Sequence, residues 1–355
     1  MTLSCTSIPV AANEPLVLVQ SPKGTLIESF ANPMHPVTLC SISSNASNVK
    51  FISRTEIGYA ITSNPDSPYD GVTTLQRMSL KDKKPIGVAT LQGYVADIEW
   101  SPDGSSVAIL ASQLWLKVGS AAPRALTAPF EGGGREGTSF DESIVRFSHD
   151  GKYLVMVNTG VYGQAPKSAA QAMLQVRSVP DGKLVWVAPT ALKESSWTTM
   201  AAWSHLSDRL YYYYGLPNGQ HGVLTWDAPA RVATFAGSLA WRSPSVSLDD
   251  RLVAYEVISF TDQKPRVEVR DLVSGSVRVL PGVLGQPTLL SDTVMIEQHF
   301  VFDSAGMGPP YAPDRYYVLN LTTNKETALP ASFNCPLMMD ASRCSQHQPI
   351  EVWPH

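Results

Sequence analysis

Charged residues are scarce in this sequence, and no part of it concentrates one sign of charge. Asp, Glu, Lys and Arg make up 16% of the 355 residues, against about a quarter in a typical soluble domain. The 27 basic and 31 acidic residues are mixed along the chain and give a formal net charge of −4. Because nucleic-acid binding depends on a concentrated basic surface, we expect no nucleic-acid partner.

Long apolar runs are missing as well. No uninterrupted apolar stretch approaches the roughly 18 residues needed to cross a bilayer, so the sequence predicts no membrane span. Residues 1–13 lack the basic start and the apolar stretch of a signal peptide. These features indicate a chain that folds around its own core, and we expect a monomer.

Cysteine is rare, and its four copies lie near the two ends, at positions 5, 40, 335 and 344. Cys335 and Cys344 could close a short loop, and Cys5 could reach Cys40. Four buried thiols are the alternative, because connectivity cannot be read from one sequence. Disulfides would favour an extracytoplasmic location, either secreted or periplasmic.

Helical periodicity is absent over any long stretch, and a strand-rich unit repeats instead. Its copies are Ile98–Leu110, Val145–Val157 and Ala201–Tyr213, with weaker ones at Val49–Tyr59, Ser245–Tyr255 and Thr288–Ile296. Each copy is an alternating strand that ends in an aromatic or apolar anchor, followed by a polar turn and a second strand rich in β-branched and aromatic residues. The anchors are Phe51, Trp100, Phe147, Trp203, Val246 and Leu290. Their intervals of roughly 45 residues are typical of one propeller blade.

The Ser-Pro-Asp-Gly turn shows how a unit forms its hairpin. Pro102 presets φ, Asp103 caps the turn locally, and Gly104 adopts the positive φ that closes it. The second half of each unit adds two more alternating strands, for example Met173–Arg177 and Lys183–Val187. Four strands per unit predict a β-propeller blade.

The sequence therefore predicts an all-β fold, a single β-propeller of seven four-stranded blades whose last blade is shared by the two termini. Six blades with a trailing tail are the alternative. Blade repeats are expected near residues 49–93, 95–130, 144–189, 198–237, 241–282 and 286–330, and the closing blade from 14–30 plus 331–355. Residues 16–27 would supply the outer strands of that blade and the segment after Phe333 its inner pair. Such sharing would leave no open sheet edge.

The segments Trp100–Gly104 and Phe147–Gly151 carry a family resemblance. Their turn and anchor residue are similar to those of TolB-type propellers and of the WD40-like propeller domains that precede prolyl oligopeptidase and dipeptidyl peptidase catalytic domains. The Gly-His and Trp-Asp pairs of WD40 blades themselves are missing. In TolB-like proteins the propeller binds other proteins, so the resemblance implies a binding role and defines no activity.

No local motif indicates chemistry. Nucleophile elbows, zinc and calcium patterns and phosphate-binding loops are missing, so we expect no cofactor and no metal site. In a propeller the loops that join second to third strands, and one blade to the next, share one face, and long loops on a rigid scaffold often carry function. The expected loops of this face are 30–48, 62–71, 127–143, 158–172, 188–199 and 298–314.

Candidate catalytic residues on these loops are His35, His299 and Arg242. Imidazole titrates near neutrality and can act as general acid or base, and the guanidinium could hold an anionic group. In a closed seven-blade ring both histidines could approach the same side of the channel mouth. Candidate ligand-binding residues are Trp197, Trp241, Tyr94, Arg135 and Tyr162. Each residue also has an ordinary interpretation as a solvated loop residue or a turn cap.

Two functions are compatible with this pattern. The first is a binding module that recognises a protein, peptide or glycan through the long-loop face. The second is an enzyme of lyase, hydrolase or cyclase type with a small-molecule pocket at the channel mouth. A deep pocket that combines His with a carboxylate or Arg would favour chemistry, and a broad shallow face would favour binding.

Overall fold

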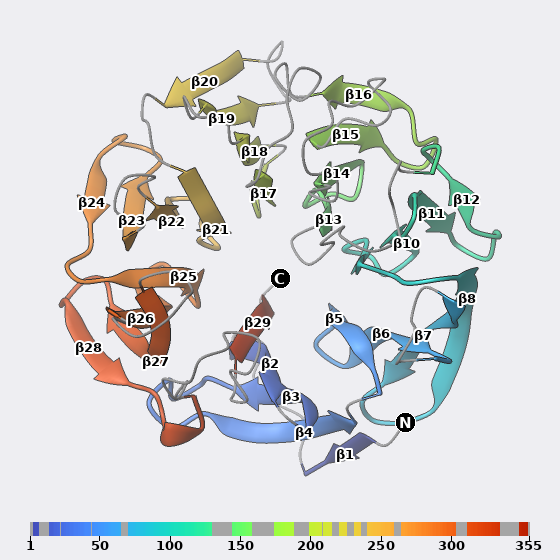
Figure 1. Cartoon of the computed structure of the whole chain (residues 1–355), viewed down its shortest axis with the longest axis horizontal. Helices are drawn as coiled ribbons and strands as arrows, with labels where there is room; N and C mark the ends of the chain where they lie inside the picture. The colour runs from blue at the N-terminus through green and yellow to red at the C-terminus, as the bar shows by residue number, and fades with distance from the viewer. Residues whose placement is uncertain are drawn as a thin grey trace. The chain divides into compact units, whose positions relative to one another are not determined.

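Short alternating segments form strands throughout the part of the chain that the structure describes. The computed structural model describes residues 3–6, 14–21, 23–43, 45–64, 70–129, 144–157, 174–187, 199–207, 209–214, 220–225, 231–235, 240–258, 264–302, 311–333 and 348–353. They form an all-β protein, a β-propeller built from antiparallel blades (Figure 1). No helix among these residues is long and apolar enough to cross a membrane.

The chain divides into two compact units, and the first comprises residues 1–3, 43–216 and 222–234. Its blades are four-stranded sheets in which strands follow one another in sequence order. Their strands are β5 (Ser47–Ser53), β6 (Glu56–Thr62), β7 (Val72–Ser79) and β8 (Pro85–Gln92); β9 (Asp97–Trp100), β10 (Ser106–Leu110), β11 (Leu114–Val118) and β12 (Arg124–Ala125); β13 (Ile144–Phe147), β14 (Tyr153–Val157), β15 (Leu174–Ser178) and β16 (Leu184–Val187); and β17 (Thr199–Trp203), β18 (Arg209–Tyr214), β19 (Gln220–Thr225) and β20 (Arg231–Phe235).

The second unit comprises residues 4–42, 217–221 and 235–355. It holds two further four-stranded blades, formed by β21 (Ala240–Val246), β22 (Leu252–Ile258), β23 (Pro265–Asp271) and β24 (Val277–Val279), and by β25 (Leu284–Leu289), β26 (Val294–Phe302), β27 (Tyr311–Asn320) and β28 (Lys325–Ala328). A five-stranded sheet combines both ends of the chain in the order β1 (Leu3–Cys5), β4 (Val37–Ser43), β3 (Gly24–Ser29), β2 (Leu16–Ser21) and β29 (Gln348–Trp353).

Six four-stranded blades are thus present among the described residues, the number of the alternative prediction. The sheet shared by the two ends is present as well, because β2 pairs antiparallel with β29. Its composition differs from the prediction, since β2 and β3 occupy the middle and β29 is the one described strand from the C-terminal end. β4 lies outside β3, in a segment predicted to be loop, and β1 forms the edge beyond it; Leu39, Cys40 and Ile42 of β4 are buried.

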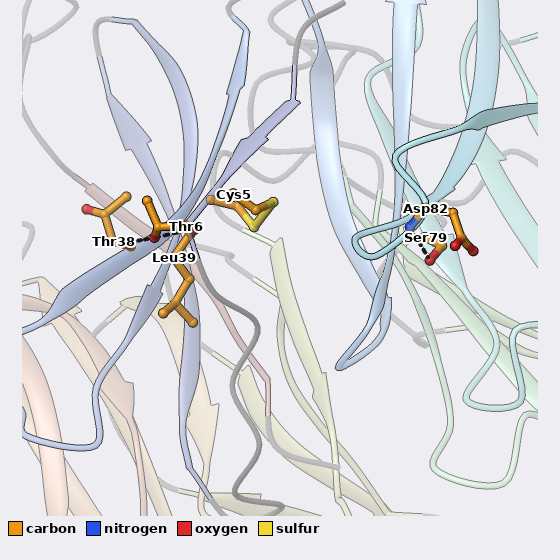
Figure 2. Close-up of a disulfide and its surroundings, with 7 residues drawn as sticks. Cys5, Thr6, Thr38, Leu39, Ser79 and Asp82 are labelled. Atoms are coloured by element: carbon orange, nitrogen blue, oxygen red, sulfur yellow. Dashed lines mark hydrogen bonds between the residues drawn. A yellow bond between two sulfur atoms is a disulfide. The ribbon is translucent and has the colours of Figure 1, made fainter.

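A disulfide attaches β1 to β4 at the edge of this sheet. Cys5 and Cys40 are bonded, and the neighbouring Thr6 N–H donates to the Leu39 carbonyl at 2.8 Å. Figure 2 shows the bond beside the Thr6 contacts with the backbone of Thr38 and Leu39. The pairing of the two N-terminal cysteines is therefore confirmed, whereas Cys335 and Cys344 lie outside the described residues.

The predicted anchors are buried between blades. Trp100 is 5% exposed, Phe147 8% and Trp203 7%. Trp100 packs with Ile52 and Leu75 of the preceding blade as well as with its own sheet. Its ring lies directly over Gly58 of β6, where a Cβ atom would approach the indole Nε1 to 2.0 Å. A bare backbone on one blade therefore accommodates the large anchor of the next.

Three of the polar turns that follow the anchors are built alike. The Ser101 hydroxyl donates to Asp103 at 2.6 Å and accepts from the Ser106 N–H at 2.8 Å. Gly104 follows at φ 67°, as the sequence predicted. The same serine–aspartate pair recurs in the turns that follow β13 and β21. Each turn carries its own side-chain bonds and so holds the hairpin at a fixed geometry.

Antiparallel order gives every blade two different ends. The connections from first to second strand, such as 148–152, and from third to fourth strand, such as 179–183, lie at one end, which we call the turn end. The connections from second to third strand, such as 111–113, and from blade to blade, such as 93–96, lie at the other, which we call the loop end. By the strand bounds, the longest connections, 126–143 and 158–173, join strand ends of the loop end, whereas others there, such as 93–96 and 111–113, are as short as the turns.

Candidate functional site

One face of strand β26 is apolar near the start of the strand and carries ionisable side chains further along. Met295 lies in the apolar cluster between its blade and the blade of β21–β24. Two and four residues further on, the same face presents Glu297 and His299, because side chains alternate along a strand. The register places Tyr317 of β27 opposite Glu297, and pairs Leu319 with Glu326 of β28. The pairing of three strands thus gathers two carboxylates and an imidazole on one face of the blade.

The three groups surround a small common space. The His299 Nε2 atom lies 3.7 Å from Glu297 Oε1 and 3.6 Å from Glu326 Oε2. One ligand-type atom from each residue falls within 4.8 Å of the other two. The imidazole stacks on the Tyr317 ring, with centroids 3.9 Å apart and planes 24° apart. This stacking orients the ring toward the two carboxylates.

Glu297 is the most buried member of the cluster. It has no exposed surface, and neither carboxylate oxygen accepts a hydrogen bond from the described residues. Burial raises the pKa of Glu297, the charge of Glu326 raises it further, and His299 and Arg278 act in the opposite direction. Arg278 is itself engaged, since it donates to the Leu321 carbonyl at 2.7 Å and to the Asn324 side chain. A buried carboxylate without donors calls for a compensating proton or cation.

A second charged cluster, on the first strands of three successive blades, is fully paired and serves as a contrast. Asp97 accepts from Arg146 Nη1 at 2.5 Å and from the Val145 N–H at 3.0 Å. Lys50 Nζ lies 3.8 Å from Asp97 and 3.9 Å from Glu99. These contacts link β5, β9 and β13, so this network ties blades together and leaves no carboxylate without a donor.

The predicted catalytic residues lie at different places in the second unit. His299 lies in β26, although its segment was predicted to be loop; this strand extends to Phe302. His35 is exposed in the connection 30–36, which joins the third and fourth strands of the shared sheet and therefore belongs to its turn end. Arg242 lies on β21, opposite Glu256. The strand order gives no support to a meeting of His35 with His299, and the convergence of the three stays a prediction.

Two of the five predicted ligand-binding residues lie among the residues that the structure describes. Tyr94 is half-buried in the blade-to-blade connection at the loop end, after β8. Trp241 lies on β21, opposite Val257. Trp197, Arg135 and Tyr162 lie outside the described residues. The ligand-binding role of all five stays a prediction.

Glu297 and Glu326 were not predicted from the sequence, which indicated no metal site. One local signal was present, since glutamate and histidine two residues apart on a strand share a face. Glu326 could not be found in this way, because its proximity depends on the register of β27 with β28.

No protein-family model matches the sequence, and no curated protein matches it. Solved structures do resemble it. The C-terminal WD40 domain of Sif2 gives a TM-score of 0.52 at 13% identity, over 79% of this chain and 71% of that one. The β-propeller domain of the Trilobed protease from Pyrococcus furiosus gives 0.50 at 9%, over 80% and 82%. A prolyl endopeptidase gives 0.51 at 14%, over 90% of this chain and 49% of that one. At these identities the likeness confirms the propeller fold alone.

Proposed function

We propose that this protein is a binding module that recognises a protein, peptide or glycan through the loop end of its blades. The asymmetry between the two ends carries this proposal. At the turn end, hairpins are short and held by bonds such as Ser101 to Asp103. At the loop end, strands are joined by segments as long as 158–173. Long connections on a rigid scaffold are a usual place for recognition.

The strands of the blades carry the contacts that stabilise the fold, which agrees with a binding role for the loops. Interblade anchors such as Trp100 and ion pairs such as Arg146 with Asp97 lie within the strands. These strand residues hold neighbouring blades together, so the longest loop-end connections can vary in sequence to suit a partner. Structural neighbours include a WD40 domain and peptidase propellers, which agrees with a scaffold used for several purposes.

An enzyme of lyase, hydrolase or cyclase type is the second candidate. It is favoured by one observation, the buried Glu297 beside His299, since perturbed carboxylates next to histidine are common in active sites. We also propose an extracytoplasmic location, because a disulfide such as Cys5–Cys40 persists in oxidising compartments.

Photo-crosslinking from the two ends of one blade tests the binding proposal. A benzoylphenylalanine replaces Tyr94 at the loop end or, as the matched control, Lys84, which is exposed in the turn-end connection between β7 and β8. Both variants are produced in the native host and irradiated. We expect a discrete crosslinked product from position 94 and none from position 84. Equal products from both positions, or a product from position 84 alone, would contradict recognition through the loop end.

A further inference from the structure

We propose that Glu297, His299 and Glu326 form a binding site for a divalent transition-metal ion of the Zn²⁺ class. The three residues come from β26 and β28 of one blade and present one nitrogen and two carboxylate donors to a common point. This inference is independent of the binding proposal, because it concerns a site within a blade and not the loop-end surface.

The spacing of the donors suits a shared ion better than a set of hydrogen bonds. The His299 Nε2 distances of 3.7 Å to Glu297 and 3.6 Å to Glu326 exceed the range of about 2.7–3.2 Å for such bonds. Donors about 2.0–2.1 Å from a tetrahedral Zn²⁺ lie about 3.3 Å from one another. The two distances to His299 would have to shorten by a few tenths of an ångström, and the separation of the two carboxylates, which lies within 4.8 Å, by at most about 1.5 Å.

Burial supplies an independent argument. Glu297 is fully buried, and both of its carboxylate oxygens lack a hydrogen bond from the described residues. Its Oε1 atom lies 3.7 Å from His299 Nε2, and the Arg278 guanidinium donates to the Leu321 carbonyl and the Asn324 side chain. A doubly charged cation would neutralise Glu297 and Glu326 together and remove the cost of the unpaired buried charge.

The donor set also selects the class of ion. An imidazole ligand suits Zn²⁺ and its neighbours, whereas Ca²⁺ and Mg²⁺ prefer oxygen ligands alone. The side chains of His299 and Glu326 are 27% and 32% exposed. One side of the cluster is therefore open to solvent, and the ion would have three protein ligands with a position left for water. That is the arrangement of a reactive zinc site, in contrast to a closed structural one.

Isothermal titration calorimetry with Zn²⁺ tests the site. Untagged protein, with its disulfides kept oxidised, is stripped with a chelator and titrated with Zn²⁺, and in separate runs with Ca²⁺ and Mg²⁺. Wild type should bind one equivalent of Zn²⁺ at this site, and neither Ca²⁺ nor Mg²⁺ should compete. Glu297→Gln and His299→Asn should each weaken that event at least tenfold. The matched controls His205→Asn and Glu268→Gln, which change the same residue types elsewhere, should leave it unchanged.

X-ray absorption of the Zn²⁺-loaded wild type provides a measurement that does not depend on how the variants fold. We expect a shell of nitrogen and oxygen neighbours with one imidazole and no sulfur. Sulfur neighbours would assign the ion to cysteine and overturn the proposal. No bound equivalent in wild type, or binding unaffected by both His299→Asn and Glu297→Gln, would also overturn it.

Discussion

Gly58 and Trp100 form an interblade contact that makes a sharp stability prediction. The replacement Gly58→Ala adds one methyl group at a position where the indole atoms Nε1, Cε2 and Cζ2 lie 2.0, 2.4 and 2.7 Å away. All three distances are shorter than any stable carbon contact, so the Trp100 ring must leave its place. The ring is enclosed by Ile52 and Leu75, and the Arg77 guanidinium lies 5.6 Å from its centroid, so the displacement has little room.

The expected magnitude follows from two opposing terms. Inserting a methyl group into a packed contact costs about 1–3 kcal/mol, whereas replacing glycine by alanine within a strand gains about 0.5–1 kcal/mol. An approach of 2.0 Å puts the insertion cost at the upper end of that range, about 2–3 kcal/mol, so Gly58→Ala should lower the free energy of unfolding by about 1–2.5 kcal/mol. Trp100→Ala alone should cost about 3–5 kcal/mol, because it removes a buried ring and leaves a cavity. In that background the new methyl has space, and Gly58→Ala should be neutral or stabilising.

Urea unfolding followed by far-ultraviolet circular dichroism measures all four members of the cycle, and this signal does not depend on Trp100 fluorescence. Gly87→Ala is the matched control, because Gly87 also lies in a strand of the same blade and a Cβ there meets nothing within 4 Å. A destabilisation by Gly58→Ala that persists unchanged in the Trp100→Ala background would refute the proposed contact. A neutral effect in wild type would do so as well.

Three further predictions concern the ends and the turns. Cys40→Ser should lower the free energy of unfolding by about 2–4 kcal/mol, because the disulfide restricts the entropy of the unfolded chain. Thiol titration of unreduced, unfolded wild type should find at most two free thiols, and four free thiols would contradict the Cys5–Cys40 bond. Deleting residues 348–355 should expose β2 as a sheet edge, lower the melting temperature and promote aggregation, and a truncated protein as stable as its parent would contradict the shared sheet. The hydroxyl of Ser101 and the Ser105 contacts lower the pKa of Asp103, so its stabilisation is present above the ordinary pKa and is lost as pH falls through the folded-state value. Asp103→Asn should therefore cost at most about 1 kcal/mol at neutral pH and little in acid; an equal loss at both pH values would contradict this.

The repeat was readable from the sequence because each blade encodes the same local physics. Anchors such as Trp100 and Trp203, and turns such as the one that ends in Gly104, depend on neighbours within one hairpin, and the structure confirms them. The segment 30–48 was misjudged as loop. Its strand β4 borders the short edge strand β1, and Val37 at its start is 57% exposed, so its apolar alternation is weaker than that of a central strand.

The cluster at His299 shows why a site on a propeller blade is harder to read than the blade itself. His299 drew attention because of its residue type, and it was assigned to a loop because β26 is longer than the second strands of the earlier repeats. Glu297 lies on the same strand. An acidic residue in an apolar run indicates either a solvent-exposed strand face or a buried charge that needs a counterion. The structure decides between these, since Glu297 is buried and lacks a donor among the described residues. The other blades have no carboxylate at the position equivalent to Glu297. A departure from the repeat, and not a feature of the repeat, therefore marks the candidate site.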